Sequence, residues 1–171
     1  MYEFCNQMIK IRKAEESDLP AILEIYNEII LNTTAVYDYL PHTLEMRQAW
    51  FNLKEKEGYP VFVATEDEGI LGFSTLGVFR QWAAYKYSVE HSLYVAHNSR
   101  GKGIGRLLMQ PLITSAKEMG KHTMIAGIDS LNAASIKLHE DFGFEKVAHF
   151  KEVGFKFTCW LDLVFYQLML E

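Results

Sequence analysis

A glycine-rich segment with basic residues, Arg100-Gly101-Lys102-Gly103-Ile104-Gly105, gives the clearest chemical signal in this sequence. Glycines let the backbone approach a ligand closely, and the first amides of a helix have no partners within the helix. The helix dipole favours negative charge at the same end. Arg100, Lys102 and Arg106 add positive charge around the turn. The segment therefore predicts a site that binds phosphate groups.

The flanking segments are those that such a site needs. Residues 88–95 have the alternation of a strand, and apolar residues recur at helical spacing from Ile104 onward. The segment lacks the G-x-x-x-x-G-K-[ST] spacing of a P-loop and the G-x-G-x-x-G spacing of a dinucleotide site. A plain glycine-rich turn with solvated basic residues is the alternative interpretation.

The spacing R-x-x-G-x-G over residues 100–105 resembles the pyrophosphate loop of the GCN5-related N-acetyltransferase (GNAT) family. Three further segments are similar to this family or to its phosphinothricin and methionine sulfoximine acetyltransferase branch. Together the motifs cover nearly the whole chain, from about Ile9 to Leu170. The further segments are Asn132–Ser135 with Leu138–Phe144, Arg80 with Tyr85–Glu90, and Gly154–Asp162.

The pattern of apolar residues and turn signals predicts an α/β protein with the order β-α-α-β-β-β-α-β-α-β-β. One domain over residues 1–171, with a core from about 9 to 170, is expected. The resemblance implies a GNAT fold, a mixed sheet whose central parallel strands splay apart, flanked by helices. The predicted strands cover 8–13, 61–65, 70–79, 88–95, 123–129, 145–153 and 159–170, and the predicted helices 18–30, 44–57, 104–119 and 132–142.

The ends and faces of the helices are also predicted. Ser17 is expected to cap the first helix, Thr43 to cap the second, and Gly120 to follow the third. In the second helix, apolar residues at helical spacing predict the face that covers the sheet. They are Met46, Ala49, Trp50 and Leu53.

The resemblance implies transfer of an acetyl group from acetyl-CoA to the amine of a small amino-acid-like substrate, such as phosphinothricin or methionine sulfoximine. Such an amine is mostly protonated at pH 7, so a nearby carboxylate must accept its proton. Glu90 is the candidate, because burial among Tyr87, Val89 and Leu93 would raise its pKa. The alternative is a surface acid paired with Lys86.

His139 stands where many relatives have a tyrosine thought to protonate the departing thiolate, and histidine can also donate a proton near neutrality. A satisfied polar residue is the alternative. Asn132 is expected to contact the pantetheine arm or to cap its helix. The residues expected to bind acetyl-CoA are Leu93, Tyr94, Val95, Arg100, Gly101, Lys102, Gly103, Ile104, Gly105, Arg106, Asn132 and Ser135.

For the acceptor, Arg80 is the first candidate to bind a carboxylate and Lys156 the second. Tyr37, Tyr87, Glu90 and Trp160 complete the expected acceptor site, although core or interface packing would explain the aromatic residues equally well. Residues 157–159 depart from the small polar or glycine-containing turn of many relatives, which leaves the size and polarity of the acceptor open. The resemblance implies a homodimer in which residues 149–160 reach the partner's acceptor site.

Composition limits the remaining classes. The chain has 171 residues, 49% of them hydrophobic, and a net charge of −5, which makes a general nucleic-acid surface unfavourable. We expect no metal, no membrane span, and free thiols at Cys5 and Cys159. The first residues lack the pattern of a signal peptide, so a cytoplasmic location is expected. A protein N-terminal or lysine acetyltransferase and a non-catalytic acyl-CoA-binding module are the alternative functions.

Overall fold

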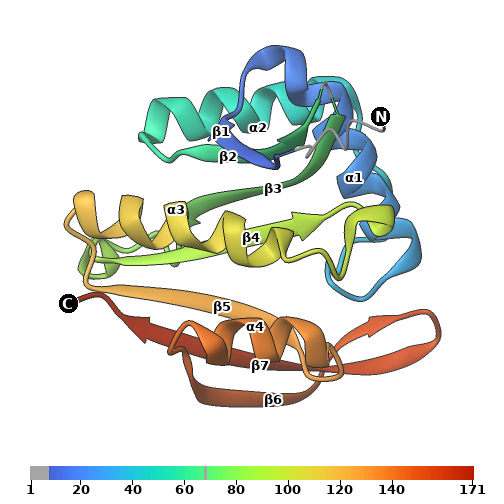
Figure 1. The fold of residues 1–171 in the computed structure, drawn as a ribbon. Coiled ribbons are helices and arrows are strands. Elements are labelled where there is room, and N and C mark those ends of the chain that lie inside the picture. The colour runs from blue at the N-terminus through green and yellow to red at the C-terminus, as the bar shows by residue number, and fades with distance from the viewer. Residues whose placement is uncertain (1–7, 68) are drawn as a thin grey trace, which may run out of the picture.

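The computed structural model describes residues 8–67 and 69–171, which form a seven-stranded mixed sheet flanked by helices (Figure 1). The strand order is β1-β2-β3-β4-β5-β7-β6. The helices are α1 (Leu19–Asn32), α2 (Leu44–Glu57), α3 (Ile104–Glu118) and α4 (Ala133–Asp141). The strands are β1 (Lys10–Lys13), β2 (Val61–Glu66), β3 (Gly69–Val78), β4 (Ser88–Val95), β5 (Thr123–Asp129), β6 (Glu145–Lys156) and β7 (Cys159–Met169).

This architecture confirms the predicted α/β class and the predicted order of elements. The main difference in bounds lies in β6, which continues three residues beyond Val153 to Lys156. Its pairing with β7 closes at Lys156 and Cys159, so Phe157 and Thr158 form a two-residue turn. Both turn residues have positive φ, 51° and 61°, as the tightest hairpin turns require.

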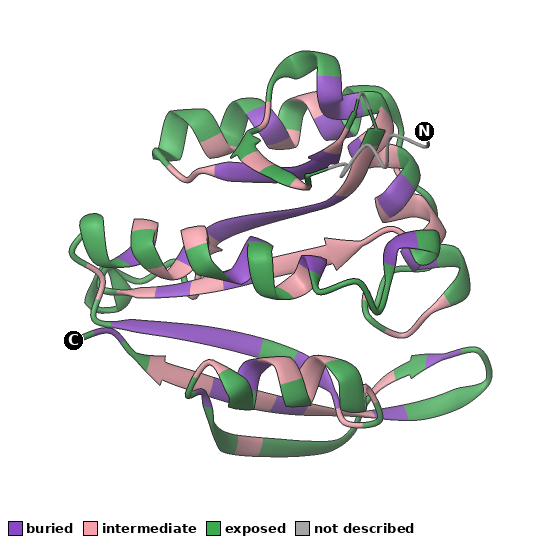
Figure 2. Cartoon of the chain, viewed as in Figure 1, coloured by how far each residue is buried: buried purple, intermediate pink, exposed green. Residues whose placement is uncertain are grey.

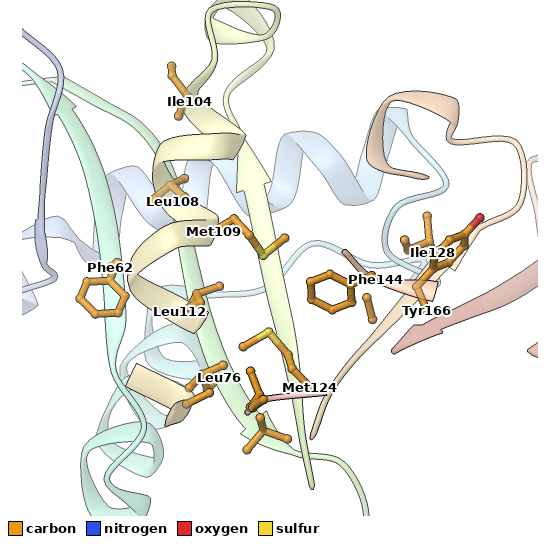
Figure 3. Close-up of a cluster of buried hydrophobic side chains, with 14 of the residues drawn as sticks. Phe62, Leu76, Ile104, Leu108, Met109, Leu112, Met124, Ile128, Phe144 and Tyr166 are labelled. Carbon is orange, nitrogen blue, oxygen red and sulfur yellow. The ribbon is translucent and has the colours of Figure 1, made fainter. Parts of the chain in front are cut away.

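The helices form a layer on each face of the sheet. α3 and α4 cover one face, where Leu108, Met109 and Leu112 pack against Leu76 and Met124 (Figure 3). α1 and α2 cover the other face around Phe73. Buried residues follow the inner strands, whereas β6 is mostly exposed (Figure 2). Within the described residues, no helix is long and apolar enough to cross a membrane.

The two central strands separate along their length. β4 and β5 run parallel and pair at three positions only, which end at Glu90 and Ile125. Beyond this point β4 stays paired with β3 up to Val95, and β5 stays paired with β7 up to Asp129. The facing edges of β4 and β5 therefore diverge, as Figure 1 shows between these two strands.

The structure confirms some of the predicted helix details and corrects others. The Thr43 hydroxyl accepts a hydrogen bond from the amide of Met46, and Gly120 follows α3 with a φ of 65°. Ser17 does not cap α1. It lies inside a 3₁₀ turn (Glu16–Asp18) in which Asp18 accepts from the Glu15 amide and pairs with Arg12. Asp18, the residue before α1, does not cap the helix with its side chain, because Arg12 and the Glu15 amide already bind its carboxylate.

The predicted inner face of α2 is wrong for three of its four residues, whereas Trp50 packs against the core as predicted. Met46, Ala49 and Leu53 are exposed, whereas Arg47 and Phe51 are buried. The guanidinium of Arg47 lies 4.0 Å from the ring centre of Tyr26 and 4.7 Å from that of Trp50. Stacking on aromatic rings lets an arginine occupy an inner position that apolar periodicity assigns to other residues.

Candidate active site

A cavity of about 300 Å³ lies where β4 and β5 separate. β4 contributes residues 90–94 to its wall and β5 contributes residues 126–129. The start of α4 closes one side, and residues 35–37, which follow α1, close another. A narrow opening between two strands suits an extended ligand, because the strand edges offer unpaired backbone groups along its length.

Glu90 lies at the point where the strands part, opposite Gly77 of β3 and Ile125 of β5. Its Oε1 is 3.5 Å from the place where a Cβ on Gly127 would lie, so the absence of a side chain at Gly127 leaves room beside the carboxylate. Burial raises the pKa of Glu90, and the charges of Arg80 and Lys54 partly oppose that rise. The direction is the one that the sequence predicted, and among the described residues no ion pair joins Glu90 to Lys86.

His139 is buried and stacks on a second buried histidine, His91 of β4. Nδ1 of His139 lies 2.7 Å from the carbonyl oxygen of Ser135, which requires a proton on Nδ1. Nε2 of His139 must then accept a hydrogen bond from Nε2 of His91, 3.0 Å away. This assignment leaves Nδ1 of His91 as a buried acceptor without a hydrogen-bond partner.

Both rings are neutral in this arrangement. Burial lowers the pKa of His91 to about 3 and also lowers the pKa of His139. A second cation beside the first would add repulsion to the cost of burial. The pair therefore forms an uncharged polar wall of the cavity.

The glycine-rich turn has the geometry expected of an anion site. Gly101 and Gly103 have φ of 77° and 81°, and α3 begins at Ile104 directly after them. In the described part of the chain, the amides of residues 101–103 donate to no carbonyl in a turn, loop or cap. Gly105 allows close packing, because a Cβ there would lie 3.1 Å from Leu138 of α4.

Two of the three basic side chains around this turn already have acidic partners. Arg100 pairs with Glu28 at 3.3 Å, and Arg106 pairs with Asp141 at 2.6 Å. For Lys102 no ion pair is present among the described residues. Of the three basic groups around this turn, the Lys102 ammonium is therefore the one most available to an anion.

Asn132 has one of the two roles expected for it, the helix cap, and its contact with the pantetheine arm stays a prediction. Its side-chain oxygen accepts from the amide of Ser135 at 3.1 Å and so caps α4. Asn132 and Ser135 also line the cavity, together with Leu93 and Tyr94 of β4. Val95, the last residue of β4, lies beyond the lining residues.

Tyr37 lines the cavity from the segment that follows α1. Its hydroxyl lies 3.4 Å from Oδ2 of Asp129 and 3.3 Å from the carbonyl oxygen of Asp162. Burial and the neighbouring carboxylates raise the pKa of Tyr37 to about 12, so the hydroxyl keeps its proton. The ring rests on Gly154, where a Cβ would lie 2.6 Å from it, and this contact requires glycine.

Lys156 has a different role from the expected contact with an acceptor carboxylate. It is buried, and its ammonium donates to the carbonyl oxygens of Ile30, Thr33 and Val36 at 2.6 to 2.9 Å. An ammonium has three N–H groups, so all of its donors are used. Lys156 therefore fixes the segment that carries Tyr37 to the end of β6.

The other expected acceptor residues lie outside the cavity lining. Arg80 is exposed beyond the end of β3, and its guanidinium donates to the carbonyl oxygen of Phe79. Tyr87 and Trp160 are 55% and 63% exposed in the single chain. The aromatic segment 80–87, expected to favour a closed pocket, is likewise exposed.

Sequence reasoning missed several lining residues. His91 has the same parity in β4 as the core residue Val89, which was an available signal for an inward side chain. Asp129 and Gly127 come from β5, whose divergence from β4 no local pattern reveals. Of the two cysteines, Cys159 is free and exposed, and Cys5 lies outside the described residues.

Comparison with known proteins gives a consistent answer. The acetyltransferase (GNAT) domain family matches residues 11–165. A methionine sulfoximine and methionine sulfone acetyltransferase from Pseudomonas paraeruginosa is 47% identical over 94% of both chains. A phosphinothricin N-acetyltransferase from Streptomyces coelicolor is 36% identical over 93% of this chain and 95% of its own length.

A solved structure of an acetyltransferase from Salmonella typhimurium, with its cofactor acetyl-CoA, superposes with a TM-score of 0.94. It is 43% identical and covers 96% of this chain and 95% of its own length. The fold, the divergent central strands and the glycine-rich turn define an acyl-CoA-dependent transferase site. The chain belongs to the GNAT acetyltransferase family and is an N-acetyltransferase.

Proposed function

We propose that this enzyme acetylates the α-amine of a small amino-acid-like acceptor of the methionine sulfoximine or phosphinothricin type, with acetyl-CoA as cosubstrate. The observation that supports this most directly is Glu90, a half-buried carboxylate at the opening between β4 and β5. The names of the relatives that share over a third of this sequence agree with the proposal. Acetyl-CoA supplies the acetyl group as a thioester.

The residues present fit this cosubstrate. The amides of residues 101–105, with Lys102 and the ends of Arg100 and Arg106, are the proposed ligands of the diphosphate. The free edge of β4 at Leu93, Tyr94 and Val95 offers backbone groups to the amides of the pantetheine arm. Asn132 and Ser135 face the same cavity from the start of α4. The fit to acetyl-CoA depends mainly on the free amides at the turn, because the N-terminus of a helix favours an anion such as the diphosphate.

Glu90 is the proposed general base. At pH 7 the acceptor amine is largely an ammonium, which a carboxylate attracts and then deprotonates, directly or through a water. A pKa raised by burial makes the Glu90 carboxylate a stronger base than an ordinary surface glutamate. His139 is the proposed proton donor to the departing sulfur. Nε2 of His139 carries no proton while it accepts from His91, so this role requires Nε2 to take up a proton, such as the one that leaves the acceptor amine, before the proton passes to the thiolate.

Tyr37 forms one wall of the proposed acceptor site and Arg80 its cationic rim, close enough to Glu90 to lower the pKa of that carboxyl. Tyr87 and Trp160 complete the site if a second copy of the chain covers them, because each is exposed in one chain. Lys156 contributes by holding the segment of Tyr37 in place. We therefore propose a homodimer.

A cytoplasmic location is proposed from the free cysteine, Cys159, because thiols stay reduced in that compartment.

The test is a thiol-release assay with acetyl-CoA and a panel of amines. The panel holds L-methionine sulfoximine, L-phosphinothricin, several protein amino acids and a short peptide with a free N-terminus. We expect turnover of the first two and little with the peptide. Acetyl-CoA binding without turnover of any amino acid would overturn the proposal, and preference for the peptide would favour a protein acetyltransferase.

The Glu90→Gln variant separates an enzyme from a binding module. Loss of a general base lowers kcat by about 10² to 10⁴. Binding of acetyl-CoA, measured by calorimetry, should stay unchanged because the glycine-rich turn is intact.

A further inference from the structure

A second cavity, of about 160 Å³, lies under α2. Its floor includes Ser92 and Tyr94 of β4, which have the same parity as Glu90 and so face the same side of the sheet. Both residues also line the larger cavity between the strands. The opposite residues on β3, Thr75 and Phe73, continue the floor. The second cavity therefore lies over the same face of the sheet as the Glu90 side chain.

This cavity contains a buried cation without a carboxylate partner. Arg47 is 2% exposed, and its Nε has no hydrogen-bond partner. Its guanidinium lies between the rings of Tyr26 and Trp50. Nη2 lies 3.3 Å from Nδ1 of His42, whose other nitrogen faces Asp38, so the ring separates Arg47 from that acid.

Lys54 adds a second cation to the same cavity. Its ammonium donates to the carbonyl oxygen of Leu76 and lies 2.7 Å from where a Cβ on Gly77 would be. Gly77 is directly opposite Glu90 in the sheet. No ion pair involves Arg47 or Lys54 among the described residues. Because a buried charge is costly without an anion, this arrangement favours a ligand with an anionic or strongly polarised oxygen.

We infer that the cavity under α2 binds the oxygen-bearing end of the acceptor's side chain, with Arg47 and Lys54 as its ligands. The inference rests on the proposed function, in which the amine lies at Glu90. Successive residues on one face of a strand are roughly 7 Å apart, so the cavity begins several bonds away from the amine. Arg47 lies at the end of the cavity near Tyr94, because it stacks on Tyr26, whose ring contacts that of Tyr94. An α-carboxylate shares a carbon with the amine and is too close to the amine to reach Arg47. The substrate class is therefore an amino acid whose side chain ends in a sulfone, sulfoximine, phosphinate or carboxylate.

The experiment compares L-methionine sulfone with L-norleucine, an acceptor with a hydrocarbon side chain, in the wild type and Arg47→Met. Methionine keeps much of the packing between Tyr26 and Trp50. The wild type should prefer the sulfone in kcat/KM, and Arg47→Met should reduce this preference about 10- to 100-fold, with the KM for acetyl-CoA unchanged. Lys56→Met, which removes an exposed cation from the same helix, should leave the preference intact.

Additional measurements distinguish the possible outcomes of this experiment. An equal loss for both acceptors, or an unchanged preference, would overturn the inference while the proposed function stands. A further acceptor is the analogue of L-methionine sulfone with an α-carboxamide in place of the α-carboxylate. If Arg47→Met instead lost discrimination between these two acceptors, the α-carboxylate would occupy the cavity, and the inference that the side chain binds there would be wrong. If Arg47→Met fails to fold, Lys54→Met carries the same comparison. Absence of turnover with every amine would overturn the proposed function but not the inference about the cavity. In that case, calorimetry of L-methionine sulfone binding without acetyl-CoA, in the wild type and Arg47→Met, still tests the cavity.

Discussion

The ionisation of Glu90 sets the acidic side of the expected pH profile. Burial raises its pKa, and the charges of Arg80 and Lys54 lower it. A base must be deprotonated, so kcat/KM should rise with pH through the pKa of Glu90. Arg80→Met removes one opposing charge and should shift this rise to higher pH. The measurement is kcat/KM for methionine sulfoximine against pH in both proteins. A shift to lower pH, or none, would contradict the assigned environment of Glu90.

The histidine pair makes a prediction about acid stability. A histidine is half protonated near pH 6.5 in the unfolded chain, whereas burial lowers the pKa of His91 to about 3 in the fold. Above pH 6.5 both states are neutral and the full stability is present. Between pH 6.5 and 3 only the unfolded state gains this proton, so stability falls as pH falls. His91→Leu should show a smaller decrease in melting temperature from pH 7 to 4 than the wild type.

That comparison has a matched control in His122, an exposed histidine before β5 that makes no ion pair among the described residues. His122→Leu should keep the wild-type dependence on pH in the range governed by His91. Equal slopes for the wild type and His91→Leu would show that the pair does not exclude protons as its burial implies.

Single residues also show what the sequence could and could not predict. Glu90, Asn132 and the glycine turn follow from local pattern and resemblance, because their neighbours in the chain determine their conformation. His91 and Arg47 depend on what packs against them from other elements, α4 and α1 respectively. Lys156 has the charge that an acceptor carboxylate needs, but its partners are carbonyl groups more than 100 residues away in the chain.

At the scale of elements, the turn before α3 should bind the cosubstrate through its backbone. Gly103 has a φ of 81°, and a Cβ there would meet no atom within 4 Å. Gly103→Ala therefore tests backbone conformation alone, with a strain of about 1 kcal/mol for an alanine in this region. We expect a several-fold higher KM for acetyl-CoA and an unchanged KM for the acceptor. Steady-state kinetics with each substrate varied would check this.

Gly58, which follows α2 with a φ of 75°, also has an open Cβ position and provides the control. Gly58→Ala should cost similar stability without changing either KM. A rise in the acceptor KM alone for Gly103→Ala would argue against a phosphate site at this turn.

The contact between β6 and the end of α1 is a second element-scale prediction. Lys156→Met removes the donor to three carbonyl groups, and each buried carbonyl left without a partner costs about 1–3 kcal/mol. We expect a loss of roughly 2–5 kcal/mol in the free energy of unfolding, because some of these groups can recover water. Release of Tyr37 should also raise the acceptor KM. Urea unfolding and kinetics measure the two effects, with the exposed Lys151→Met as control.

The order of elements was predictable because hydrophobic period, caps and turns are local properties of the chain. The inner face of α2 was not, since Arg47 replaces an apolar residue there by stacking on aromatic rings. The length of β6 was also underestimated. Phe157 and Thr158 adopt positive φ in a two-residue turn that usually favours glycine or asparagine, so the turn carried no sequence signal.

At the scale of the whole molecule, all seven strands join one sheet, in agreement with the single domain expected over residues 1–171, which stays a prediction. The end of the β6–β7 hairpin extends away from the rest of the sheet (Figure 1). Apolar side chains along this hairpin are about half exposed or more. They are Phe150, Val153, Phe155, Phe157 and Trp160. Such a group of exposed apolar residues is typical of an interaction surface.

The proposed homodimer uses this hairpin, so light scattering should give twice the mass of the chain at micromolar concentration. The double variant Val153→Glu with Phe155→Glu places two charges in the apolar surface and should give the monomer mass. Val147→Glu adds one charge to an exposed residue nearer the start of β6 and should remain dimeric. If the acceptor site includes residues of a second copy, the monomeric variant should lose turnover and retain acetyl-CoA binding. A wild type that is monomeric at assay concentrations, yet fully active, would require Tyr87 and Trp160 to lie outside the acceptor site.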